Sequence, residues 1–136
     1  MGYLLDTNIL SELRKGNKCN GGVSAWFSQT NSDELYVSVL ILGEIRRGVE
    51  QIRLRDPIAG QSLEQWLQQI ENNVTQQVLP VNKTIADRWG RLNVPNLLPA
   101  IDGLLAATAL EHDLTLVTRN VRDVERSGVR LLNPFI

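Results

Sequence analysis

Short apolar runs of strand length alternate along this chain with longer segments of helical period. The runs lie at residues 3–5, 35–37, 78–81, 114–117 and 129–132. Between them, apolar residues recur every three or four positions, which is typical of amphipathic helices. Strands that alternate with helices favour a parallel sheet covered by helices on both faces. We therefore expect an α/β fold in three layers, with ligands bound beyond the carboxyl ends of the strands.

Capping residues and prolines set the expected bounds of the helices. Ser38 and Asn82 are favoured N-cap residues, Thr7 is a third candidate, and Pro57 suits the first position of a helix. A helix over 23–30 should follow a Gly/Asn-rich loop at 16–22 and bury Trp26 and Phe27. The pattern predicts helices over residues 7–14, 23–30, 39–49 or beyond, 57–74, 83 to near 95, 99–112 and 121–127.

The length and composition are those of an ordinary globular domain. The chain has 136 residues, of which 43% are hydrophobic and 21% charged, so we expect a single domain over residues 1–136. No apolar stretch is long enough to cross a bilayer, and no signal peptide is visible. A lone cysteine, Cys19, predicts a reducing, cytoplasmic location. The net charge of -1 means that any nucleic acid must bind at a local basic patch.

Three acidic residues stand out because they occupy apolar surroundings. Asp6 follows the first apolar run, Glu44 lies within the segment 39–45, and Asp102 interrupts the stretch 97–110. Lone carboxylates in such places are costly to bury unless they are paired or bind a metal. With one histidine and one cysteine in the chain, the usual zinc sites are excluded. Three carboxylates instead indicate Mg²⁺ or Mn²⁺ and phosphoryl-transfer chemistry.

Each acid also has an ordinary structural interpretation when it is taken alone. Asp6 suits a helix N-cap, Glu44 the exposed face of an amphipathic helix, and Asp102 the first turn of a helix, where the dipole favours a negative charge. Asp123 is equally compatible with an exposed first-turn acid. The case for an active site therefore depends on all of them together.

Four segments together resemble the PIN-domain family, and within it the VapC-type ribonuclease toxins of bacterial toxin–antitoxin pairs. The first is Leu-Leu-Asp-Thr-Asn at residues 4–8, and the second is 38–48 with Gly-Glu-Ile-Arg-Arg-Gly. The third, Asp-Gly-Leu-Leu-Ala-Ala-Thr-Ala at 102–109, is the most specific. The fourth is Leu-Val-Thr-Arg-Asn-Val-Arg-Asp at 116–123 with the closing Asn-Pro-Phe at 133–135. Their order and spacing cover nearly the whole chain.

The resemblance implies a PIN-like parallel sheet flanked by helices, Mg²⁺- or Mn²⁺-dependent cleavage of RNA, a homodimer and a cognate antitoxin. It places Asp6, Glu44 and Asp102 in the metal site. Some relatives carry a fourth acid directly after the Thr-Arg pair; this chain has Asn120 there and Asp123 three residues later, so both are candidates for that position.

Neighbouring polar residues extend this candidate site. Thr7 and Thr118 follow strands and are expected to hydrogen-bond a carboxylate or a water molecule. Arg46, Arg47 and Arg119 are candidate contacts for RNA phosphates, although arginines in such positions more often belong to a solvated helix face.

Two other functions compete with a ribonuclease toxin. A haloacid-dehalogenase-type phosphatase also begins with an acid after its first strand. It normally needs a second Asp two residues later, where this chain has Asn8. The other alternative is a PIN-like module that has lost catalysis and binds a partner or serves regulation.

Overall fold

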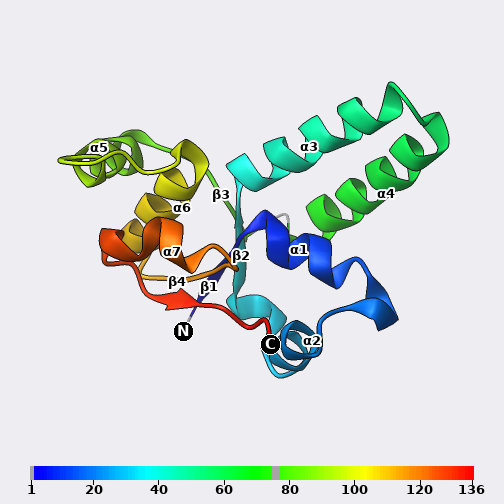
Figure 1. Cartoon of the computed structure of the whole chain (residues 1–136), viewed down its shortest axis with the longest axis horizontal. Helices are drawn as coiled ribbons and strands as arrows, with labels where there is room; N and C mark the ends of the chain where they lie inside the picture. The colour runs from blue at the N-terminus through cyan, green and yellow to red at the C-terminus, as the bar shows by residue number, and fades with distance from the viewer. Residues whose placement is uncertain (1, 75–76) are drawn as a thin grey trace.

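A computed structural model of the chain describes residues 2–74 and 77–136. Within that part, five parallel strands form one sheet in the order β3-β2-β1-β4-β5 (Figure 1). The strands are β1 (Tyr3–Leu5), β2 (Leu35–Ser38), β3 (Val78–Leu79), β4 (Thr115–Val117) and β5 (Leu131–Leu132). Each predicted strand is present, some of them shorter than the apolar run that predicted them.

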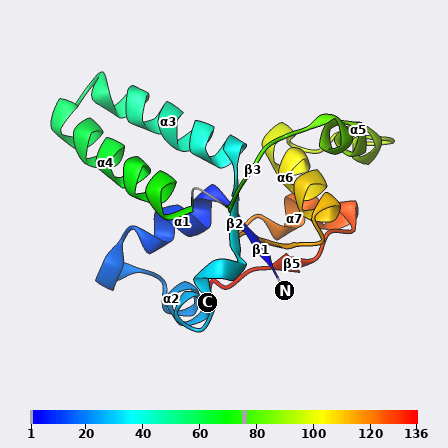
Figure 2. The ribbon, with the colours of Figure 1, turned by 180° about the vertical axis from the view of Figure 1, so that it is seen from behind.

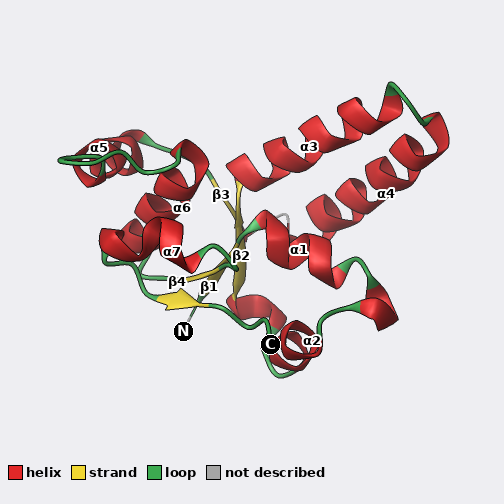
Figure 3. Ribbon diagram, viewed as in Figure 1, coloured by secondary structure: helices red, strands yellow, loops and turns green. Residues whose placement is uncertain are grey.

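Helices connect the strands in the alternation that the sequence predicts (Figure 3). They are α1 (Thr7–Leu13), α2 (Gly21–Ser28), α3 (Val39–Arg53), α4 (Pro57–Val74), α5 (Lys83–Leu92), α6 (Ala100–Glu111) and α7 (Val121–Val124). Short 3₁₀ turns occur at η1 (Gly16–Lys18), η2 (Ser32–Glu34) and η4 (Glu125–Ser127). The predicted α/β class, a parallel sheet flanked by helices, is confirmed.

Alternate residues of β1 face opposite layers of the molecule. Leu4 is fully buried in a cluster with residues of α3, α4 and α6, whereas Leu5 packs with Ile9 of α1 and Val23 of α2. Figures 1 and 2 show α1 and α2 on one side of the sheet and α5, α6 and α7 on the other. Burial on both faces explains why the central strands are continuous apolar runs.

Capping follows the sequence at three helices and departs from it at two. Ser38 and Asn82 cap α3 and α5, and Pro57 opens α4, as predicted. The N-cap of α1 is not Thr7 but Asp6, which confirms the structural interpretation of Asp6 as a helix N-cap. Helix α2 begins at Gly21, inside the predicted loop, because the Asn20 side chain accepts hydrogen bonds from the next turn.

The α2 region also corrects one expectation about the core. Trp26 is half-buried and meets the Tyr3 ring edge-on, with centroids 5.3 Å apart. Phe27 is not buried: 39% of its surface is exposed. The two residues are adjacent on a helix, so they point about 100° apart and only one of them faces the sheet.

The carboxyl ends of the strands define the functional edge. Parallel strands all end at the same edge, and the helices that follow β1 and β2 begin there. Figure 1 shows the first turns of α1, α3 and α6 gathered at this edge. Among the described residues, no helix is long and apolar enough to span a membrane.

Candidate active site

Asp6 is the most deeply buried acid at this edge, with 6% of its surface exposed. Its backbone N–H donates to the Val117 carbonyl at 3.0 Å, so the residue sits between the ends of β1 and β4. Oδ1 accepts the Thr7 N–H at 2.7 Å. Oδ2 accepts the Thr118 hydroxyl at 2.7 Å and the Asn8 amide at 3.3 Å. These donors offset the cost of burying a carboxylate and fix its orientation.

Glu44 is exposed on the second turn of α3 and is tied to α1 through one hydrogen bond. The Thr7 hydroxyl donates to its Oε1 at 2.7 Å. Thr7 therefore joins the helix that follows β1 to the helix that follows β2. Together with the bond from Thr118 to Asp6, this gives both threonines the carboxylate contacts expected of them. Their effect on a bound metal stays a prediction.

Asp102 lies half-buried in the first turn of α6, and the negative charges of the other acids act on its pKa. Burial, and then the negative charges of Asp6, Asp123 and Glu44 in that order of effect, together raise its pKa from 3.8 to about 6. A carboxylate that resists ionisation beside three others marks a region of negative potential. Such a region favours a bound cation, and the structure brings these acids together from four separate elements.

The three central acids line a common open groove of about 730 Å³. One wall comes from α1 and another from the start of α6, and the segment after β4 contributes a third. The lining residues are Asp6, Thr7, Asn8, Ser11, Glu12, Lys15, Glu44, Pro99, Ala100, Ile101, Asp102, Arg119, Asn120 and Phe135. We call this the acidic groove. An extended polyanion fits its open form, provided that cations offset the charge of the acids.

The donor set suits a hard divalent cation, but the acids do not form a ready cage. Among residues 2–74 and 77–136, no three Asp, Glu, His or Cys side chains are arranged to hold a metal ion. The chemistry of the donors still fits: carboxylate oxygens are what Mg²⁺ and Mn²⁺ prefer. The metal role of Asp6, Glu44 and Asp102 stays a prediction.

Both candidates for the fourth position lie at the edge of the site. Asn120 lines the acidic groove, and its backbone N–H donates to the Thr118 hydroxyl at 3.0 Å. Asp123 is exposed in the first turn of α7, yet its charge acts on Asp102. The structure brings both toward the site, and the choice between them stays open.

The three candidate arginines have different surroundings. Arg119 lines the acidic groove. Arg47 is exposed on α3, one turn beyond Glu44. Arg46 instead donates both terminal nitrogens to Glu64 of α4, at 2.6 and 2.7 Å. This pairing, together with a hydrogen bond from Arg53, lowers the pKa of Glu64 to about 2, and the pairing raises the pKa of Arg46. With these donors occupied, Arg46 braces the α3–α4 hairpin, which argues against the predicted phosphate contact.

Two residues of α1 were missed from the sequence. Asn8 donates to Asp6, and its Oδ1 accepts the Arg119 N–H at 3.2 Å, so it joins two loops of the site. Glu12 is 8% exposed and accepts the Asn20 N–H at 2.8 Å and the Lys15 ammonium at 3.0 Å. These contacts hold the pKa of Glu12 below its usual range. The available signal was their spacing: Asn8 and Glu12 are four residues apart and share one helical face.

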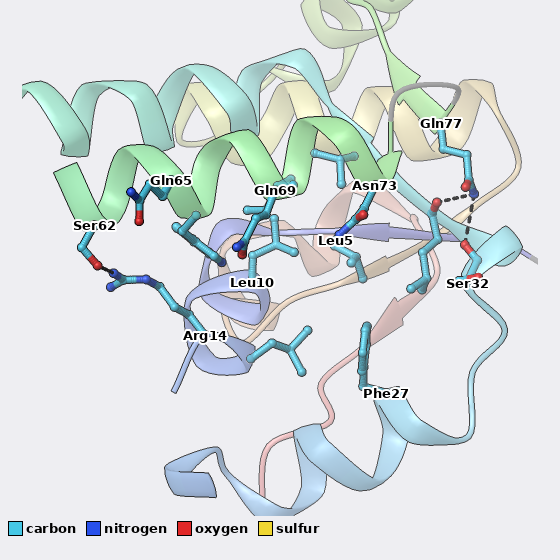
Figure 4. A pocket seen from close by; sticks show the side chains of 15 residues that line it. Leu5, Leu10, Arg14, Phe27, Ser32, Ser62, Gln65, Gln69, Asn73 and Gln77 are labelled. Atoms are coloured by element: carbon cyan, nitrogen blue, oxygen red, sulfur yellow. Dashed lines mark hydrogen bonds between the residues drawn. The ribbon is translucent and has the colours of Figure 1, made fainter. Parts of the chain in front are cut away.

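A second groove, of about 850 Å³, lies on the other side of α1 and is largely apolar. Figure 4 shows Leu5, Leu10 and Phe27 facing it from one side and Gln65, Gln69 and Asn73 of α4 from the other. At its ends, Arg14 donates to Ser62 at 3.2 Å and Gln77 donates to the Ser32 carbonyl at 3.3 Å. None of the described residues that line it is Asp or Glu. We call it the apolar groove.

The PIN domain family model matches residues 3–126 of this sequence. The chain belongs to the PIN domain family. Its relatives include a VapC ribonuclease, Y4jK, from Sinorhizobium fredii, which is 29% identical over 97% of this chain and 96% of its own length. The toxin FitB of Neisseria gonorrhoeae is 26% identical over 97% of both chains. The resemblance to VapC-type PIN toxins is therefore confirmed.

A solved structure gives the same result in three dimensions. The crystal structure of FitAcB from Neisseria gonorrhoeae superimposes with a TM-score of 0.87 at 29% identity and covers 97% of each chain. The PIN fold of this chain is thus supported along nearly its entire length. The ends of β1 and β4 and the starts of α3 and α6, which carry the acidic groove, all lie inside the matched region.

Proposed function

We propose that this chain is a Mg²⁺- or Mn²⁺-dependent ribonuclease that acts as the toxin of a toxin–antitoxin pair. The observation that carries the proposal is the acidic groove: Asp6, Glu44 and Asp102 reach it from three elements of a PIN fold. The names of the relatives, a ribonuclease and a toxin, support the same activity. Phosphodiester hydrolysis suits the site because a cation held by carboxylates can neutralise charge on the phosphate and activate the attacking water.

In this proposal Asp6 and Asp102 are direct ligands, and Glu44 either ligates or orients a water as a base. When bound by these residues, the cation would supply charge neutralisation and would lower the pKa of a water molecule. Thr118 and Thr7 hold the carboxylates of Asp6 and Glu44 in place through their hydroxyl donors. Asn120 or Asp123 supplies the fourth oxygen ligand of the cation.

RNA would enter the acidic groove as an extended single strand. Arg119, which lines this groove, would contact a phosphate, and Arg47, exposed on α3, would provide a second contact. Such contacts position the strand without reading its sequence. The net charge of -1 means that binding depends on this local patch and on the cation.

An antitoxin would inhibit by laying a peptide segment into the acidic groove, with a basic side chain directed at the acids. The apolar groove supports a larger contact, because both grooves border α1: Leu10 and Leu13 face one, and Asn8 and Glu12 the other. An antitoxin segment that crosses α1 would place apolar side chains in the apolar groove and its basic side chain in the acidic groove. We also propose a C₂ homodimer, the commonest closed arrangement.

The central experiment replaces Asp6 and Asp102 singly with Asn. Each variant should lose about a hundredfold or more of RNA cleavage, because a direct ligand matters at least as much as the residues that orient it. Calorimetric titration with Mn²⁺ should show weakened binding in both. Asp87→Asn, which removes an exposed carboxylate of α5 outside the groove, is the matched control. Unchanged affinity and activity in both groove variants would refute the metal site.

Measurements on the wild-type protein distinguish the ribonuclease toxin from the alternative functions and test the proposed partners. A wild-type protein that binds no Mn²⁺ and cuts no RNA would indicate the non-catalytic interaction module. Light scattering tests the homodimer, and a monomer at micromolar concentration would refute it. Full RNA cleavage by a complex with the cognate antitoxin would refute inhibition through the acidic groove.

A further inference from the structure

Arg119 differs from Arg46 because the donors of its guanidinium are not engaged. Within residues 2–74 and 77–136, its guanidinium makes no ion pair and no side-chain hydrogen bond, whereas that of Arg46 is held by Glu64. The guanidinium carbon instead lies 4.7 Å from the centroid of the Phe135 ring. An arginine that stacks on an aromatic face uses the face of its own plane and leaves its edge N–H groups available.

The segment that carries Phe135 is anchored to the start of α2. The Ile136 N–H donates to Asn20 Oδ1 at 3.2 Å, and the Asn20 amide returns a hydrogen bond to the Ile136 carbonyl at 3.1 Å. Residues 133–136 also approach Gly22 so closely that a Cβ there would overlap the Pro134 carbonyl oxygen. The backbone on both sides of Phe135 is thus held against the start of α2.

Glu12 also supports the segment that carries Phe135, through its contact with Asn20. It accepts the backbone N–H of Asn20, the residue that both caps α2 and binds the last residues of the chain. The positive charge of Arg119 also contributes to holding the pKa of Glu12 low, after the hydrogen bonds from Asn20 and Lys15. Lys15 forms the ion pair with Glu12, at 3.0 Å.

We propose that Phe135 is a positioning residue for Arg119. Its ring holds the guanidinium plane at the rim of the acidic groove, with the edge donors directed to a phosphate of the RNA strand. This inference rests on the proposed function and names how one side of the substrate is held. A guanidinium presents two parallel donors to a phosphate only when its plane is oriented, so a fixed plane lowers the entropic cost of that contact.

The test measures cleavage of a short fluorescein-labelled single-stranded RNA with Mn²⁺ and, with Ca²⁺ in place of Mn²⁺ so that a divalent cation still offsets the acids, its binding by anisotropy. Phe135→Leu should raise KM and the Kd for RNA by about three- to tenfold, with kcat unchanged. Phe135→Tyr keeps the aromatic face and should behave as wild type. In an Arg119→Ala background, Phe135→Leu should have no further effect, because the ring then has nothing to position.

A purely structural role for Phe135 gives a different pattern. Loss of kcat in Phe135→Leu, or an equal further loss on top of Arg119→Ala, would overturn the inference while the proposed function stands. Arg119→Lys provides a second measurement that leaves the ring in place: it keeps the charge, loses the planar face and should weaken RNA binding. Wild-type affinity in that variant would also overturn the inference. Failure of the wild-type protein to bind or cut RNA would overturn the proposed function and this inference together.

Discussion

The hydroxyl of Thr118 donates a 2.7 Å hydrogen bond to Oδ2 of Asp6, and so joins the ends of β4 and β1 across 112 positions of the sequence. Both side chains are buried. The same hydroxyl oxygen accepts the Asn120 N–H at 3.0 Å. Thr118 therefore fixes the rotamer of the buried acid and the first turn of the segment that follows β4.

Replacement of Thr118 by Val tests this relationship. The variant keeps the shape of the side chain but removes a buried hydrogen bond to a charged group, so the free energy of unfolding should fall by about 1–3 kcal/mol. Metal affinity should fall as well, because Asp6 loses its orientation. Thr118→Ser keeps the hydroxyl and is the control, measured by urea unfolding and Mn²⁺ calorimetry. Equal stability of the Val and Ser variants would contradict the assignment.

The pKa of Asp102 predicts a pH dependence of the metal-free protein. Burial and the neighbouring acids raise that pKa from 3.8 to about 6, so the folded state holds the proton more tightly than the unfolded state. The ionised form is thus destabilising above about pH 6, and this penalty disappears as the pH falls toward 4. Asp102→Asn should stabilise the metal-free protein near neutral pH by about 1–2 kcal/mol, after allowance for solvent screening.

Thermal unfolding in EDTA across this pH range measures the effect. The gain in Tm from Asp102→Asn should be largest at neutral pH and should vanish toward pH 4. With Mn²⁺ present the order should reverse, since only the wild-type protein gains binding energy from the cation. A gain that is independent of pH would show that the substitution acts through packing rather than through charge.

The sequence predicted the fold well because the local signals agreed with one another. Apolar runs, prolines and the caps at Ser38 and Asn82 gave the element order, and the end of β1 gave Asp6. The errors concern the first residues of two helices, where more than one neighbouring residue could serve as the N-cap. Asp6, not Thr7, caps α1, and Asn20 starts α2 earlier than the pattern of apolar residues indicated.

The contacts that complete the site could not be predicted because they depend on tertiary proximity. Nothing near Glu12 in the sequence shows that it accepts the Asn20 N–H. The pairing of Arg46 with Glu64 requires α4 to fold back on α3, and only this geometry separates Arg46 from Arg119. The sequence predicted which acids belong to the site and where each lies in its helix or strand. It did not predict the residues that hydrogen-bond or pair with them.

The fourth position can be assigned by comparing two substitutions. If Asp123 completes the oxygen donors, Asp123→Asn should lower RNA cleavage much more than Asn120→Ala. We favour Asp123, because a carboxylate binds a hard cation better than an amide oxygen does, and its charge already reaches Asp102. Steady-state rates at saturating Mn²⁺ give the ranking. The reverse ranking would place Asn120 in the site, and near-wild-type rates in both would indicate three acids only.

Gly103, the residue after Asp102, provides a last and sharper prediction about how the acid is placed. It is buried on α6, and a Cβ there would lie 3.2 Å from Leu98 Cβ and from two atoms of the Trp89 indole. Gly103→Ala should therefore push the start of α6 away from α5, at a cost of about 1–3 kcal/mol, and shift Asp102 with it.

Gly90 offers a matched control on α5, because it is helical and exposed, and nothing lies within 4 Å of an added Cβ. Gly90→Ala should stabilise the protein by about 0.5–1 kcal/mol, since alanine loses less backbone entropy on folding than glycine does. Urea unfolding should thus give opposite signs for the two substitutions, and only Gly103→Ala should weaken Mn²⁺ binding. Equal stabilisation by both, with unchanged Mn²⁺ affinity, would show that the contact between Gly103 and Trp89 does not position Asp102.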